Sequence, residues 1–218
     1  MHVWKFGFPL LGLVALAAGP LYASPITFNF GGSGEINSPA TFTAGGLTIT
    51  AYGYVGTVAN NLFQKDSSAS EDGLGLNATV NDEINANQSI IFDVSGLISK
   101  GITGGTFTLG SLQYHNASEV EGAAACVLAS NSPVATPVSC AYDLEGNSQS
   151  IGSVTLNWGS NDFVEFITDP DQSDGAGNYL VNSLAVVTTP EPPTMILFGT
   201  MLLVLGVATR RRWAESAH

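Results

Sequence analysis

The stretch ITFNF (residues 26–30) alternates strictly between apolar and polar side chains, with Ile26, Phe28 and Phe30 on one side and Thr27 and Asn29 on the other. Successive side chains of an extended chain point to opposite faces of a sheet, so this alternation predicts a β-strand with one buried face. The pattern decides the fold class, because similar stretches follow along the chain and no long stretch has the period of an amphipathic helix.

Further candidate strands follow at short intervals. Residues 47–58 (LTITAYGYVGTV) carry β-branched and aromatic side chains, and Gly53 and Gly56 either bend one long strand or close a hairpin. Seven more stretches have this character: residues 89–94, 106–114, 123–128, 138–142, 151–158, 163–168 and 179–187. About nine short strands predict an all-β protein, with an antiparallel β-sandwich or jelly-roll-like domain over residues 24–188. A helix is the alternative at residues 117–128, because three consecutive alanines favour it.

Residues 24–188 are strongly acidic. Sixteen Asp and Glu residues stand against two lysines, Lys65 and Lys100, which gives a net charge near −14. This charge argues against nucleic acid or an anionic membrane surface as a partner, because both attract clustered Lys and Arg. Two interpretations stay open: an acidic surface that keeps an exported domain soluble, and a surface that binds cations.

The first 23 residues predict a signal peptide. Lys5 gives a positive start, residues 6–18 are apolar, and Leu21, Tyr22 and Ala23 offer a cleavage point. The alternative is an uncleaved N-terminal anchor, for which the apolar stretch is short.

The tail, residues 189–213, has three parts in a fixed order: Pro190, Glu191 and Pro192, then an apolar segment, then the cluster Arg210, Arg211 and Arg212. Between Glu191 and Arg210 lie 18 residues without a formal charge. As a helix they span about 27 Å, close to the roughly 30 Å of bilayer hydrocarbon, and so predict a single C-terminal transmembrane helix.

This three-part tail resembles the PEP-CTERM sorting signal of exported bacterial proteins that exosortases process. The resemblance implies that the helix holds the chain in the inner membrane with the arginines in the cytoplasm. It also implies that an exosortase recognises Glu191 and its flanking prolines and cuts near them. The protein would then reach the cell envelope or extracellular matrix of a Gram-negative bacterium. The alternative is an ordinary membrane anchor with a positive cytoplasmic flank.

The two cysteines of the chain are Cys126 and Cys140. In an exported protein a single pair predicts one disulfide, here between two neighbouring strands, and a loop of this length adds roughly 3 kcal/mol of stability. Catalytic use would need a thiolate beside a histidine, and metal binding would need more ligands.

Two acidic segments are candidate calcium sites, because calcium prefers six to eight oxygen ligands. In the first, Asp169, Asp171 and Asp174 precede glycines. The spacing departs from an EF-hand, and an acidic hairpin loop explains the same residues. The second segment supplies three further carboxylates, those of Asp72, Asp82 and Glu83. The alternative to calcium binding in this segment is structural: the glycines form a turn, and the acidic residues line the edge of the strand that follows.

The sequence contains no recognisable catalytic motif, and we expect that the protein is not an enzyme. Residues 24–188 contain one histidine, His115, and no nucleophile elbow, phosphate loop, dinucleotide fingerprint or zinc spacing. We expect a non-enzymatic structural or polysaccharide-associated protein. The alternatives are a secreted carbohydrate-active hydrolase, using paired carboxylates or His115, and a membrane-anchored periplasmic binding module.

Exposed aromatic side chains would mark a sugar-binding surface, although most aromatic residues of strands pack in the core. The candidates are Tyr52, Tyr54, Tyr114, Tyr142, Trp158 and Tyr179. Trp158, at a predicted strand end beside Gly159, is expected to be the most exposed of them.

Overall fold

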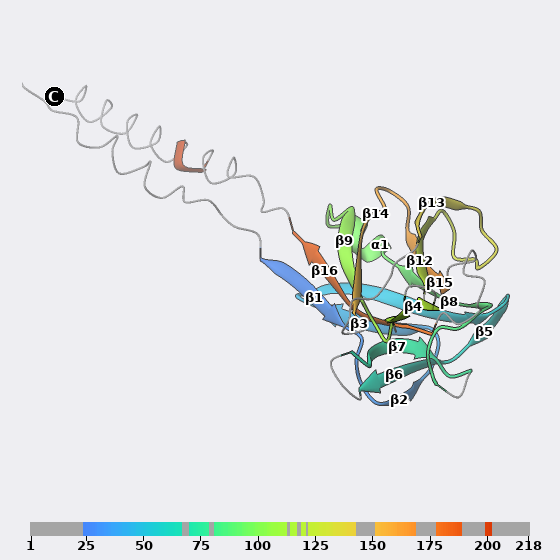
Figure 1. The fold of residues 1–218 in the computed structure, drawn as a ribbon. Coiled ribbons are helices and arrows are strands. Elements are labelled where there is room, and N and C mark those ends of the chain that lie inside the picture. Colours follow the sequence, from blue (N-terminus) through green and yellow to red (C-terminus); the bar gives the residue numbers. More distant parts are fainter. Residues whose placement is uncertain are drawn as a thin grey trace, which may run out of the picture. The chain divides into compact units, whose positions relative to one another are not determined.

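A computed structural model describes residues 24–66, 70–78, 81–112, 114–116, 119–120, 122–142, 151–168, 178–188 and 199–201. Within it, Pro25–Thr188 form one compact unit. This unit is built from antiparallel strands and contains one short helix, α1 (Ser95–Ile98), among the residues described. The strands form two seven-stranded sheets. The sheets pack as an all-β sandwich, and Figure 1 shows the arrangement of the strands.

The first sheet is antiparallel throughout, and β16 lies near its middle. Its order is β14 (Gly152–Asn157), β9 (Gly104–Gly110), β16 (Leu180–Val187), β7 (Asp72–Leu76), β6 (Leu62–Asp66) and β2 (Gly34–Ile36), with β1 (Pro25–Asn29) also paired to β16. The pairing of β1 with β16 ties the two ends of the compact unit together.

The second sheet carries both cysteines, and we call it the disulfide sheet. Its order is β13 (Pro137–Ala141), β12 (Ala123–Leu128), β15 (Phe163–Thr168), β8 (Gln88–Asp93), β4 (Leu47–Val55) and β3 (Ala40–Ala44), with β5 (Val58–Asn60) also paired to β4. A separate ribbon joins β10 (Tyr114–Asn116) and β11 (Glu119–Val120).

The all-β prediction is confirmed, and each of the nine predicted stretches contains a strand. Residues 47–58 resolve into the β4–β5 hairpin, where Gly56 takes the left-handed conformation (φ 58°) that its turn requires. The helix alternative for residues 117–128 is wrong, because the alanines at 123–125 belong to β12, buried between β13 and β15. Tertiary pairing there overrides helix propensity.

The core fills the space between the two sheets with aromatic rings. Phe92 and Phe107 lie 5.6 Å apart between ring centroids, and Phe107 and Phe166 lie 4.8 Å apart. Trp158 joins them: it is 0% exposed, and its indole N–H donates to the Ile102 carbonyl at 3.1 Å. The expectation that Trp158 is exposed is therefore wrong, because the chain turns this side chain inward as β14 ends.

Both predicted sorting segments lie largely outside the described residues. The signal peptide (residues 1–23), Pro190, Glu191, Pro192 and Arg210 to Arg212 all fall there, and the described part of the tail is a helical fragment at residues 199–201. Among the residues described, no helix has the length and apolar character needed to cross a membrane.

Candidate functional site

Lys65 lies between two glutamates at the β6–β7 end of the first sheet. Its ammonium group is 2.7 Å from Glu71 Oε2 and 2.7 Å from Glu83 Oε1. The Ser111 hydroxyl contacts the same pair, at 2.8 Å from Glu83 Oε1 and 3.0 Å from Glu71 Oε1. We call Lys65, Glu71, Glu83 and Ser111 the Lys65 cluster. The side chain of Glu83 is 5% exposed, so this carboxylate depends on its protein partners.

A close backbone approach places Glu83 in this cluster. A Cβ on Gly75 would lie 2.0 Å from the Asp82 carbonyl oxygen, so residues 82–83 cross β7 where only glycine fits. Asp82 itself adopts a left-handed conformation (φ 57°), and Ile84, the residue after Glu83, bridges to Tyr179. The fold therefore holds the Glu83 carboxylate at a fixed distance from Lys65.

Electrostatics favour a charged Lys65. Burial alone would lower the pKa of Lys65, but the hydrogen bonds and negative charges of Glu71 and Glu83 outweigh burial and raise that pKa. The ammonium group fills the position between these two carboxylates that a metal cation would otherwise take.

The carboxylates of the second predicted calcium segment do not meet. Glu83 pairs with Lys65, whereas Asp72 faces Gly31 and Asp82 is only half-buried on the crossing segment. Burial, followed by the charge of Asp66, raises the pKa of Asp72. The described residues contain no group of three or more His, Cys, Asp or Glu side chains arranged for a metal. Asp169, Asp171 and Asp174 lie outside the described residues, so calcium binding stays a prediction.

The face of the disulfide sheet that points away from the core carries a second cluster. Strand register aligns one residue from each of five strands across it: Tyr52, Ile91, Glu165, Cys126 and Cys140. A neighbouring row contains Tyr54, Ser89 and Ile167. We call these eight residues and Phe163 the tyrosine face. They form or adjoin a small apolar cluster separate from the core.

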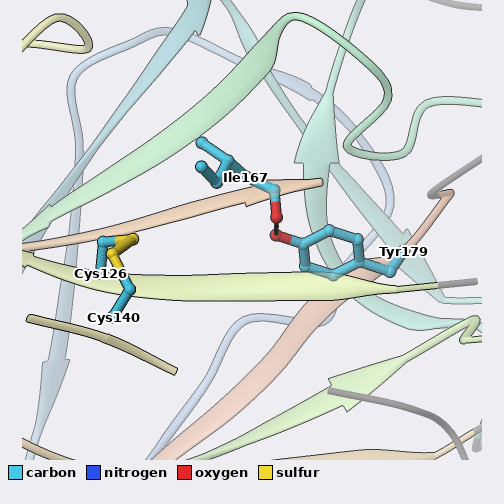
Figure 2. Close-up of a disulfide and its surroundings, with 4 residues drawn as sticks. All are labelled: Cys126, Cys140, Ile167 and Tyr179. Carbon is cyan, nitrogen blue, oxygen red and sulfur yellow. Dashed lines mark hydrogen bonds between the residues drawn. A yellow bond between two sulfur atoms is a disulfide. The ribbon is translucent and has the colours of Figure 1, made fainter. Parts of the chain in front are cut away.

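Cys126 and Cys140 are bonded to each other, which confirms the predicted disulfide between neighbouring strands (Figure 2). Their Cα atoms lie 4.1 Å apart, because they are directly opposite each other in the β12–β13 pair. Figure 2 also shows Tyr179 directed at the edge of β15, where its hydroxyl donates to the Ile167 carbonyl at 2.8 Å. Tyr179, a predicted sugar-binding candidate, is fully buried.

Glu165 is an ionisable group inside this otherwise apolar region. It is 4% exposed, and among the described residues its Oε1 has no hydrogen-bond partner. Burial raises the pKa of Glu165 to about 7, against an opposing effect of nearby Ser89, whose hydroxyl also lacks a partner of normal geometry. Glu165 and Ser89 are thus two neighbouring buried polar groups in an otherwise apolar region.

Tyr52 and Tyr54 form the more accessible side of the tyrosine face. Both are half-buried and stand two residues apart on β4, so their rings point to the same side. The Tyr54 hydroxyl donates to Asn131 Oδ1 at 3.3 Å, which anchors the β12–β13 loop to this face. The arrangement offers two aromatic rings on the same sheet face as the buried Glu165 carboxyl group, which lies on the second strand along, beyond β8.

Sequence reasoning did not single out Lys65, Ser111, Ser89 or Glu165. One signal for Lys65 was available, since it is one of two lysines among sixteen acidic residues in residues 24–188. For Glu165 the signal was a charged residue inside the apolar strand FVEFI (residues 163–167). His115, the predicted hydrolase candidate, lies in β10, away from both clusters in strand pairing.

Comparison with known proteins adds no relative: no family model, no curated protein and no solved structure matches this chain significantly. The functional argument therefore depends on the residues and contacts described above.

Proposed function

We propose that this chain is an exported, non-enzymatic β-sandwich protein that an exosortase sorts to the cell envelope or extracellular matrix of a Gram-negative bacterium. The Cys126–Cys140 disulfide carries the export part of this proposal. Disulfides persist mainly in oxidising compartments outside the cytosol. The tail with Pro190, Glu191 and Pro192 before an apolar segment and three arginines supports the sorting part.

The proposal includes two finer points. The exported domain is jelly-roll-like, and the tail spans the inner membrane as a helix until the exosortase cuts it. The uncharged length of 18 residues between Glu191 and Arg210 supports the helix.

We expect the mature protein, isolated from its native host, to lack residues 1–23 and everything after about Pro190, and to fractionate outside the inner membrane. Intact mass spectrometry of each cell fraction measures this. Glu191→Gln should block processing, because the resemblance makes Glu191 a recognition residue, whereas Glu215→Gln, beyond the arginines, should leave processing unchanged. A wild-type protein that keeps its whole tail in the inner membrane would instead be an ordinary anchored periplasmic protein.

We further propose that the exported domain associates with extracellular polysaccharide through the tyrosine face. Tyr52 and Tyr54 are partly exposed on one side of β4, and aromatic rings stack on the apolar faces of sugars. Ser89 and Glu165 lie on the same face but are buried, so the tyrosine rings carry the contact with the sugar. A neutral polymer also avoids repulsion by the strongly acidic domain.

The hydrolase alternative would need a second carboxylate working with Glu165. Asp93 lies on the neighbouring strand β8, but its Oδ1 accepts a hydrogen bond from the Ser95 backbone N–H at 2.9 Å. This carboxylate thus stabilises the start of α1, and we favour binding without hydrolysis.

Replacing Tyr52 or Tyr54 with alanine should weaken binding to the host's own extracellular polysaccharide about two- to tenfold each, the range expected for one lost aromatic contact. Affinity electrophoresis against the purified polysaccharide measures the change, and an assay for new reducing ends tests for hydrolysis in the same samples. Phe63→Ala is a matched control, because Phe63 is a half-buried aromatic residue on the first sheet outside both apolar clusters. Equal losses in all three variants would contradict the assignment.

A further inference from the structure

The free edge of β14 is unusual among the strand edges of this unit. β14 (Gly152–Asn157) is the end strand of the first sheet, and among the described strands it pairs with β9 alone. Its six residues pair without interruption, from Gly152 opposite Leu109 to Asn157 opposite Gly104. Its side chains alternate regularly, with Ser153, Thr155 and Asn157 exposed. Along this edge, the outward backbone N–H and C=O groups of β14 are paired with no described strand.

Proteins normally protect such edges with charges, proline, bulges, very short strands or covering segments. β14 contains no charged residue and no proline, has no register shift, and is six residues long. Within the described residues, this edge therefore carries none of the features that oppose the addition of a further strand.

The other described edges carry these protections. β13 begins at Pro137 and has a register shift near Leu128. β2 and β5 have three residues each, and β2 contains Glu35. β3 lies against β1, whose Ile26 side chain reaches the Gly45 turn. Among the described end strands, β14 therefore combines the greatest regular length with none of these protections.

We propose that β14 is a self-association edge, at which a second copy of this chain adds its own β14 in antiparallel register. Two copies would then join their first sheets into one continuous sheet around a two-fold axis. The charge distribution favours this occupant, because two domains that are both strongly acidic approach each other best where neither carries a charge. The inference is independent of the polysaccharide ligand and of tail processing.

The test is the oligomeric state of the protein purified from its host, measured by sedimentation over a range of concentrations. We expect a concentration-dependent dimer. Thr155→Glu should raise the dimer dissociation constant at least about tenfold, because it places like charges close together across the new strand pair. Thr43→Glu is the matched control, since Thr43 is an exposed threonine on the protected edge strand β3. A monomer at all concentrations, or equal effects of the two variants, would overturn the proposal.

A cross-linking measurement keeps the test decisive even where Thr155→Glu folds poorly. Both native cysteines are in the disulfide, so a single introduced cysteine supplies the only free thiol. Thr155→Cys should form an intermolecular disulfide under mild oxidation, whereas Thr43→Cys should not. Cross-linking of both variants to the same extent, or of neither, would contradict pairing through β14.

Discussion

Replacing Lys65 with methionine is expected to lower the free energy of unfolding at pH 7 by about 2–3 kcal/mol, less than the cost of breaking a fully buried ion pair, because Lys65 and Glu71 are partly exposed and only Glu83 is buried. Methionine keeps much of the side-chain length but not the ammonium group that lies 2.7 Å from both Glu71 and Glu83. Glu83, with a side chain 5% exposed, would keep a buried charge with only the Ser111 hydroxyl as a described donor. Urea titration of the wild-type protein and the variant measures the change.

Lys100→Met is the control for loss of a lysine. Lys100 is the other lysine of residues 24–188, and it is exposed, so its replacement should change the free energy of unfolding by less than about 0.5 kcal/mol. A rescue variant separates charge from packing: adding Glu83→Gln to Lys65→Met should restore a large part of the lost stability, because the buried group is then neutral. A Lys65→Met protein within about 1 kcal/mol of the wild type would show that the cluster contributes little.

Local patterning predicts those strands whose side chains alternate regularly. β1 and β14 are examples, because each buries one face and exposes the other along its length. β7 is different: its sequence DGLGL contains two glycines, which disfavour strands when judged locally. In the fold these glycines permit close backbone crossings, since a Cβ on Gly73 would lie 2.8 Å from the Val181 carbonyl oxygen. Such crossings join residues far apart in sequence, so local patterning does not predict them.

The candidate sites depend even more on distant contacts. The Lys65 cluster combines residues 65, 71, 83 and 111, and no local sequence motif predicts that grouping.

Trp158 illustrates a different error, because its polar and glycine neighbours indicate an exposed strand end. Its indole N–H instead finds the carbonyl of Ile102, 56 positions earlier in the chain. The disulfide was predictable because a chain with two cysteines offers one intramolecular pairing.

Replacing Glu165 with glutamine is expected to raise the free energy of unfolding by about 3 kcal/mol at pH 8 and to leave it nearly unchanged at pH 4. The pKa of Glu165 is about 7 in the folded protein, raised from an ordinary value of 4.5 mainly by burial. Below pH 4.5 the group holds its proton in both states, so it adds no pH dependence. Between these two pKa values the folded state keeps a proton that the unfolded state releases, so stability falls as the pH rises. Above about pH 7 the free-energy cost of the charged, buried Glu165 is constant and at its largest.

Thermal unfolding at pH 4, 6 and 8 tests this, and a change of about 3 kcal/mol corresponds to a shift of roughly 6–12 °C in Tm for a domain of this size. Glu35→Gln is the control, because Glu35 is exposed on β2 and loses the same charge. A stability difference between Glu165→Gln and wild type that does not vary with pH would contradict the argument. The same variant separates stability from function, because Glu165 shares a sheet face with Tyr52 and Tyr54 but is 4% exposed. Higher stability with unchanged polysaccharide binding is the expected result, and weaker binding would show that the buried carboxyl group also shapes the tyrosine contact surface.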